Sequence, residues 1–223
     1  MYSTLIKIFK FSVLIIALFA AAPVFAQPFA AEIQQFKNQD KISPPPANAI
    51  VFVGSSTFRK WTDVSSYFPG YTIINRGFGG STIPDVIFYA NDIIIPYHPK
   101  QVVIYCGDND LAFSDSVTAD TVFENFRILF ELIRRNLPGE NIVYVSIKPS
   151  PSRIRLKEKM EKANLLIQTY LSINTNAYFV DVYSKMLYPD GTIMTDIFEG
   201  DCLHMNADGY AIWQKEITPY LSK

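Results

Sequence analysis

The chain has 223 residues, of which 20 are basic and 21 acidic, so its formal net charge at pH 7 is −1. This length suits one domain with a sizeable core, and the weakly acidic balance argues against nucleic-acid binding, which requires a basic face. Two cysteines are too few for a disulfide-stabilised scaffold.

Residues 1–26 have the pattern of a secretory signal peptide. Lys7 and Lys10 supply a positive start, residues 11–22 form an apolar run, and Val24-Phe25-Ala26 places small residues where signal peptidase reads them. The run is shorter than the roughly 20 apolar residues of a membrane-spanning helix. We therefore predict cleavage, export to the periplasm or the extracellular space, and no stable membrane insertion afterwards. An uncleaved N-terminal anchor is the alternative.

Residues 27–48 are polar and then proline-rich, which indicates a short helix or arm followed by an extended lead-in. Residues 49–223 are expected to form the single folded domain. Short apolar runs, rich in β-branched residues, predict five strands that are buried on both faces. The runs cover residues 49–53, 71–74, 101–106, 141–147 and 177–182.

Helical patterns lie between these runs. They cover residues 84–94, 117–137, 155–171 and 207–221. Strand–helix alternation predicts a three-layer α/β/α, flavodoxin-like fold with a parallel sheet of about five strands. Because ligands bind at the carboxyl ends of such strands, the polar and glycine-rich stretches that directly follow strands are the first candidates for a functional site.

The chain contains only two histidines, and they differ in their predicted position. His98 precedes the third strand and should lie at the wrong end of the sheet. His204 follows Asp201 by three residues, close enough in a tight turn for the carboxylate to orient the imidazole as a general base. The alternative is an ordinary turn aspartate beside a solvated histidine.

Ser56 is a candidate nucleophile because it follows the first strand in Gly54-Ser55-Ser56. Serines in this position also cap helices, so the signal is weak alone. The G-x-S-x-G elbow of α/β-hydrolases is absent. Residues 77–82 fail as a dinucleotide-binding fingerprint, and the histidines and cysteines show no metal-ligand spacing, so we expect no cofactor and no metal.

Four stretches together carry a stronger signal. Gly54-Ser55-Ser56, residues 75–82, residues 107–110 and residues 201–204 resemble, in order and spacing, the blocks of the SGNH (GDSL-type) hydrolases. The sequences VGSSTFRKW and HMNADGYAIW add to the resemblance, which extends over nearly the whole mature chain. It implies the SGNH hydrolase fold for residues 49–223.

The resemblance also implies residue roles. Ser56 matches the nucleophile, His204 the general base and Asp201 the carboxylate that orients it. The backbone N–H groups of Ser56 and Gly80 and the side-chain amide of Asn109 match the three oxyanion-hole donors. These roles agree with what acyl transfer requires.

One position departs from the family pattern. The motif has aspartate before the serine, whereas this chain has Ser55 before Ser56. The choice of Ser56 over Ser55 as nucleophile therefore rests on the alignment of the whole block. Asp110, next to Asn109, is interpreted as structural, holding its loop through hydrogen bonds to the backbone.

The implied activity is that of a secreted serine esterase that forms an acyl-Ser56 intermediate. The partner is a small-molecule or glycan ester, with O-acetylated carbohydrate as the first candidate. One alternative is a lysophospholipase or lipase, which predicts an exposed apolar patch near the cleft and a preference for long acyl chains. Another is a non-catalytic module that binds glycan or lipid on the same fold.

Two further groups of residues leave alternatives open. Cys106 and Cys202 could form a disulfide, or both could be small buried thiols. Lys148, Arg153 and Arg155 follow the fourth strand and could face an anionic substrate group, or they could belong to a solvated basic loop.

Overall fold

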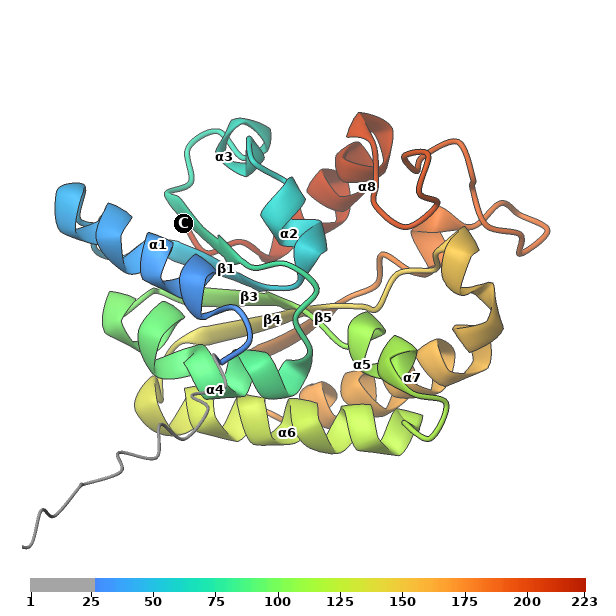
Figure 1. The fold of residues 1–223 in the computed structure, drawn as a ribbon, viewed down its shortest axis with the longest axis horizontal. Coiled ribbons are helices and arrows are strands. Elements are labelled where there is room, and N and C mark those ends of the chain that lie inside the picture. The colour runs from blue at the N-terminus through green and yellow to red at the C-terminus, as the bar shows by residue number, and fades with distance from the viewer. Residues whose placement is uncertain (1–26) are drawn as a thin grey trace, which may run out of the picture.

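The structure, a computed structural model, describes residues 27–223. The predicted signal peptide, residues 1–26, lies outside the described residues. Five parallel strands form one sheet in the order β2-β1-β3-β4-β5 (Figure 1). The strands are β1 (Ile50–Gly54), β2 (Ile73–Gly77), β3 (Gln101–Tyr105), β4 (Asn141–Val145) and β5 (Ala177–Val180). The predicted parallel sheet of about five strands is confirmed.

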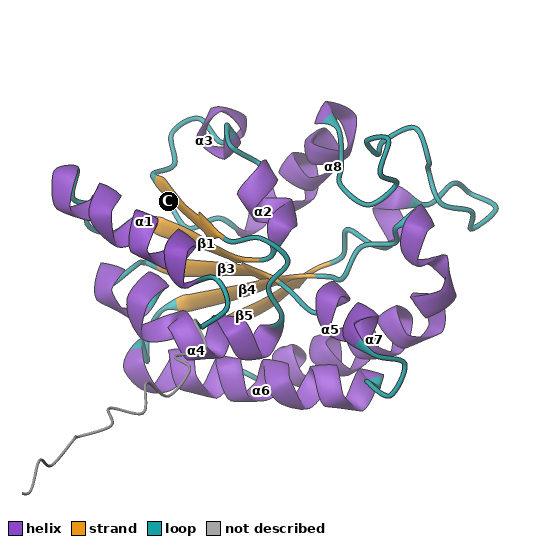
Figure 2. Ribbon diagram, viewed as in Figure 1, coloured by secondary structure: helices purple, strands orange, loops and turns teal. Residues whose placement is uncertain are grey.

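Helices cover both faces of the sheet, which confirms the three-layer α/β/α arrangement (Figure 2). They are α1 (Ala30–Ile42), α2 (Ser56–Lys60), α3 (Val64–Tyr67), α4 (Ile83–Ile93), α5 (Asp108–Phe113), α6 (Ala119–Asn136), α7 (Lys157–Ser172) and α8 (Ala207–Ile217). The 3₁₀ segments are η1 (Ile95–Tyr97), η2 (Pro151–Leu156), η3 (Ser184–Met186) and η4 (Thr218–Tyr220). Among residues 27–223, no helix is long and apolar enough to cross a membrane.

Two hydrophobic cores lie on opposite faces of the sheet. Side chains alternate along a strand, so Val51 and Val53 of β1 point into one core while Ile50 and Phe52 point into the other. The first core packs against α1, α4, α6 and α7, and the second against α2, α3 and α8. Because β1, β3 and β4 are buried on both faces, their sequences are apolar rather than alternating, apart from Gln101 and Asn141 at the starts of β3 and β4.

The segment before the first strand forms helix α1 and then an extended stretch. Ile33 of α1 is buried in the first core, and the Tyr89 hydroxyl donates a 2.6 Å hydrogen bond to the Pro28 carbonyl. Asp40 accepts hydrogen bonds from Arg76 and Tyr97. These contacts fasten the segment along the side of the sheet.

The sequence-based boundaries needed several corrections. The second strand begins at Ile73 and runs to Gly77, later than residues 71–74, so part of the polar stretch 75–82 is itself strand. The long pattern at 117–137 shortens to α6, and the closing pattern at 207–221 divides into α8 and η4. Helices α2, α3 and α5 were not predicted, because helices of four to six residues are too short to show a hydrophobic period.

Candidate active site

The predicted site residues all lie at the carboxyl ends of the strands. Ser56 is the first residue of α2, directly after β1. The turn between them requires Gly54, whose φ is 138° and where a Cβ would lie 1.8 Å from the Tyr105 carbonyl oxygen. Since the backbone N–H of a first helical residue has no acceptor within its helix, the Ser56 N–H is available to a ligand.

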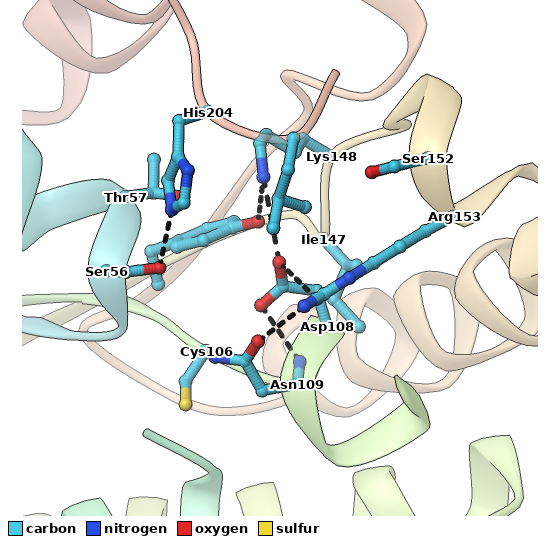
Figure 3. A network of polar contacts seen from close by, with 12 residues as sticks. Ser56, Thr57, Cys106, Asp108, Asn109, Ile147, Lys148, Ser152, Arg153 and His204 are labelled. Atoms are coloured by element: carbon cyan, nitrogen blue, oxygen red, sulfur yellow. Dashed lines mark hydrogen bonds and ion pairs between the residues drawn. The ribbon is translucent and has the colours of Figure 1, made fainter. Parts of the chain in front are cut away.

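His204 brings together two segments that are far apart in sequence. Its Nε2 lies 2.9 Å from Ser56 Oγ (Figure 3). Its Nδ1 lies 2.6 Å from Asp201 Oδ2. The three side chains thus form one continuous hydrogen-bonded chain. His98, the other histidine, is exposed and lies before β3, as its sequence position predicted.

The backbone of the turn holds Asp201 in place. Its Oδ1 accepts hydrogen bonds from the backbone N–H groups of Leu203 and His204, each at 2.9 Å. Partial burial would raise the pKa of Asp201, but the hydrogen bonds from the His204 ring and from these two N–H groups outweigh it and lower the pKa well below its usual range. Asp201 is therefore ionised at neutral pH, as a group that stabilises an imidazolium must be.

Gly80 and Asn109 approach the site from two other loops. Gly80 has a φ of 67°, in the left-handed region that favours glycine, and no acceptor within residues 27–223 pairs with its N–H. Asn109 lies near the start of α5, and its Nδ2 donates a 3.0 Å hydrogen bond to the Ser81 carbonyl. An amide nitrogen has two donors, so one remains for a ligand.

Ser55 differs clearly from its neighbour. It occupies the N-cap position of α2 but makes no side-chain capping bond, and its hydroxyl is buried without a hydrogen-bond partner in the described chain. Its backbone N–H donates to the Tyr105 carbonyl at 3.0 Å, which joins the turn to β3. Ser56 Oγ, and not Ser55 Oγ, is therefore the hydroxyl within hydrogen-bond distance of His204.

A buried group of charges lies beside Asn109, and the sequence did not predict it. Lys148 is fully buried, so its interpretation as part of a solvated basic loop was wrong. Its Nζ lies 3.6 Å from Asp108 Oδ2 and 3.2 Å from the Tyr105 hydroxyl, while Arg153 Nη1 lies 2.9 Å from Asp108 Oδ2. Arg155 is exposed and pairs with Asp115, as a solvated loop residue would. The sequence signal that could have indicated this group was the position of its three charged residues: Asp108 follows β3, and Lys148 and Arg153 follow β4.

Burial and the neighbouring charges shift the pKa values of Asp108 and Lys148 in opposite directions. Desolvation would raise the pKa of Asp108, but Lys148 and Arg153 outweigh it and lower the pKa. Desolvation lowers the pKa of Lys148, and the attraction of Asp108 opposes that change. A buried ion pair of this kind costs desolvation energy on both sides, so it is weak evidence for a purely stabilising role.

Asp110 binds the backbone where the loop after β2 meets α4. Its carboxylate accepts the backbone N–H of Ile83, the first residue of α4, at 3.0 and 3.2 Å. Burial raises the pKa of Asp110 to about 7, although this hydrogen bond opposes the shift. The sequence analysis expected Asp110 to hold its own loop through hydrogen bonds to the backbone, whereas these hydrogen bonds hold the start of α4.

The two cysteines are free thiols in this structure, so the disulfide alternative was wrong. Cys106 is buried and its Sγ donates to the Ser81 carbonyl at 3.3 Å, as the buried-thiol interpretation expected. Cys202 is exposed, so that interpretation fails for it.

One group of side chains within residues 27–223 has ligand atoms close enough together for a metal ion. It consists of Glu199, Asp201 and His204, with ligand atoms within 4.8 Å of one another. Both ring nitrogens of His204 already face Ser56 and Asp201, and Lys60 pairs with Glu199 at 2.7 Å. The donor set therefore fits a hydrogen-bonded triad better than a cation site.

A cavity of about 500 Å³ opens beside Gly80, one of the three candidate oxyanion donors. Its walls include Gly80 and Asp110, together with apolar side chains from the residues just before α1, from α4, from α5 and from the loop before α6. Those apolar residues are Pro28, Phe29, Pro84, Phe113 and Val117. The cavity offers room for an apolar group next to the site.

The chain is similar in sequence to known acetylhydrolases. Platelet-activating factor acetylhydrolase IB subunit alpha1 from Pongo abelii is 26% identical over 171 residues, which cover 73% of this chain and 70% of that protein. The alpha2 subunit from Homo sapiens is 27% identical over 175 residues, which cover 73% and 71%.

Solved structures share the fold at lower identity. A GDSL-like lipase from Bacteroides thetaiotaomicron has a TM-score of 0.71 at 24% identity, covering 85% of this chain and 96% of that one. A catalytic mutant of an acetylxylan esterase from Geobacillus stearothermophilus has a TM-score of 0.60 at 17% identity, covering 79% and 94%. At these identities the structures support the fold alone.

A family model described as the GDSL-like Lipase/Acylhydrolase family matches residues 51–212. The match includes β1 to β5, Ser56, Gly80, Asn109 and the Asp201–His204 turn. Since it extends over well more than half of the chain, this protein belongs to the GDSL-like lipase/acylhydrolase family of serine ester hydrolases.

Proposed function

We propose that the protein hydrolyses short-chain carboxylic esters, acetyl esters above all, with Ser56 as nucleophile, His204 as general base and Asp201 as the residue that orients His204. The observation that carries the proposal is the unbroken chain of contacts, 2.6 Å from Asp201 to His204 and 2.9 Å from His204 to Ser56. A serine hydroxyl is a weak nucleophile until an adjacent base accepts its proton, and this arrangement supplies that base.

In the proposed mechanism, Ser56 Oγ attacks the ester carbonyl as its proton moves to His204 Nε2. The developing oxyanion accepts hydrogen bonds from the Ser56 and Gly80 N–H groups and from Asn109 Nδ2. His204 then gives its proton to the leaving alcohol, which produces acyl-Ser56. Water, deprotonated by His204, attacks the acyl group, and the acid departs as the proton returns to Ser56 Oγ. Asp201 remains ionised throughout.

The proposed substrate is an acetyl ester of a small molecule or glycan. Support comes from the sequence similarity to acetylhydrolases, and an acetylxylan esterase shares the fold. The signal-peptide pattern of the first 26 residues supports export, which would bring the enzyme to extracellular glycans.

The test is p-nitrophenyl acetate hydrolysis by the wild type and by three variants. Ser56→Ala and His204→Ala should each lower kcat by about a thousandfold or more, because either change removes the activated nucleophile. Ser55→Ala is the matched control and should retain activity, since the Ser55 hydroxyl makes no hydrogen bond in the described chain. Loss in Ser55→Ala with activity kept in Ser56→Ala would move the nucleophile by one residue. A folded wild type without turnover or fluorophosphonate labelling would favour a binding module.

The cavity beside Gly80 favours a second candidate, hydrolysis of acyl lipids. A space of about 500 Å³ with largely apolar walls could hold a longer acyl chain, although Asp85 and Asp110 also line it. Comparing p-nitrophenyl acetate, butyrate and octanoate separates the two candidates. Preference for octanoate that Val117→Trp abolishes, while acetate turnover survives, would establish the lipid candidate. Preference for acetate, together with acetate release from acetylated xylo-oligosaccharide, would establish the glycan candidate.

A further inference from the structure

Arg153 connects the buried charge group to the candidate oxyanion hole. It lies in η2, after β4, and its Nη2 donates a 2.7 Å hydrogen bond to Asn109 Oδ1. Its Nη1 forms the 2.9 Å ion pair with Asp108 described above. Figure 3 shows the Arg153 side chain extending to both residues, on the side of the site opposite His204. The guanidinium is thus fixed from one side by Asp108 and fixes Asn109 from the other.

The contacts of Asn109 define which way its amide faces. Oδ1 accepts from a guanidinium, which can only donate, and Nδ2 donates to the Ser81 carbonyl, which can only accept. A flipped amide would place donor against donor and acceptor against acceptor. Only one of the two orientations is therefore compatible with both neighbours, and it leaves the second Nδ2 hydrogen free to meet a developing oxyanion.

We propose that Arg153 is a positioning residue for the reaction, which locks the Asn109 amide so that Nδ2 serves as an oxyanion donor. The inference rests on the proposed function. Asp108 and Lys148 complete the arrangement: Asp108 holds Arg153 by its ion pair, and Lys148 lies 3.6 Å from the same carboxylate oxygen. This role accounts for the position of a costly buried charge group directly behind Asn109.

Arg153 is proposed to act on a contact that forms in the transition state, the one between Asn109 Nδ2 and the oxyanion, so its loss should affect kcat rather than KM. Removing one oxyanion donor lowers kcat by about a hundredfold to a thousandfold. Arg153→Ala, which leaves the donor present but unlocked, should lower kcat by about tenfold to a hundredfold with KM within about twofold. Arg153→Gln keeps a neutral donor and Arg153→Lys a charged one, so either should recover part of the loss if a donor to Oδ1 is what Asn109 needs.

A double-mutant cycle gives the decisive measurement. If Arg153 acts through Asn109, Arg153→Ala should cost less than about twofold in the Asn109→Ala background. Arg155→Ala is the control from the same loop, because Arg155 is exposed and pairs with Asp115; it should keep wild-type kcat. Circular dichroism and thermal unfolding establish that each variant is folded, and Arg153→Gln provides the cycle if the alanine variant is not.

The outcomes separate this inference from the proposed function. Equal losses from Arg153→Ala in the wild-type and Asn109→Ala backgrounds would overturn it, as would a loss confined to KM. Full kcat in Arg153→Ala, with Ser56→Ala inactive, would overturn the positioning role and leave the triad intact. Activity that survives in Ser56→Ala would instead reject the proposed function itself.

Discussion

At the scale of single residues, the burial of Asp110 makes the free energy of unfolding depend on pH. Its pKa of about 7 in the folded chain lies above the ordinary aspartate value of 3.8. Between these values the folded protein holds a proton that the unfolded chain has released, so stability falls as pH rises through this window. From pH 5 to pH 8 this one group should remove roughly 2 to 3 kcal/mol of the free energy of unfolding.

Asp110→Asn should therefore flatten the decline in stability between pH 5 and pH 8, because asparagine keeps an acceptor for the Ile83 N–H and does not titrate. Urea denaturation at the two pH values measures the effect. The control is Asp115→Asn, since the pair with Arg155 lowers the pKa of the exposed Asp115 and keeps it ionised across the window. A variant at Asp110 with the same pH dependence as the wild type would contradict the raised pKa.

A contact between two site residues could be predicted from the sequence where both residues lie in one short segment. Asp201 and His204 lie three residues apart, so spacing alone suggested their contact. Lys148 could not be predicted as buried, because its partner Asp108 lies 40 positions earlier, at the end of another strand. The orientation of Asn109 depends in the same way on Arg153, 44 positions away.

At the scale of elements, the strands and long helices were predictable because each contains a sustained apolar pattern, and their observed ends differ from the predicted ones by a few residues. The short helices were not. Helix α2 is five residues long, and it is held by tertiary contacts such as the 2.8 Å hydrogen bond from the Tyr210 hydroxyl to the Thr57 carbonyl. The sequence of α2 alone does not indicate a contact with a residue so distant in the chain.

Helix α1, which precedes the matched family region, supports one loop and one helix of the candidate site. Glu32 Oε2 accepts the Gly79 N–H at 3.2 Å and pairs with Arg59 Nε at 3.0 Å. Gly79 precedes the candidate donor Gly80, and Arg59 lies on the same helix as Ser56. One carboxylate thus joins the loop that carries Gly80 to the helix that carries Ser56.

Glu32→Ala should lower kcat/KM for p-nitrophenyl acetate by about threefold to tenfold, because the Gly80 loop and α2 lose a common anchor while the reacting groups remain. Lys37→Ala is the control on α1, since Lys37 pairs with Asp92 of α4 instead. Equal activity in the two variants would show that Glu32 does not position the site.

At the scale of the whole molecule, the two cores have different relations to the site. The core beneath α2 and α8 is aromatic: the rings of Phe58 and Trp213 lie 5.9 Å apart, and Trp61 stacks on Tyr210 at 4.7 Å. Phe58 belongs to the helix that begins with Ser56, and Trp213 to the helix that follows His204. This core therefore lies between the elements that carry the candidate nucleophile Ser56 and the candidate base His204, and we expect it to set the distance between them. Ile133, buried in the opposite core, lies near the end of α6, toward the amino ends of the strands.

Two truncations should separate stability from activity. Trp213→Ala should lower the free energy of unfolding by about 3–5 kcal/mol and Ile133→Ala by about 2–5 kcal/mol, since each leaves a cavity in a packed core. Only Trp213→Ala should also lower kcat, by about tenfold or more, because only its cavity lets α2 shift against α8. Urea denaturation and p-nitrophenyl acetate kinetics, both at a temperature where each variant is folded, measure the two effects. Equal kcat in both variants would mean that the Ser56–His204 distance is set by the loops alone, independently of the aromatic core.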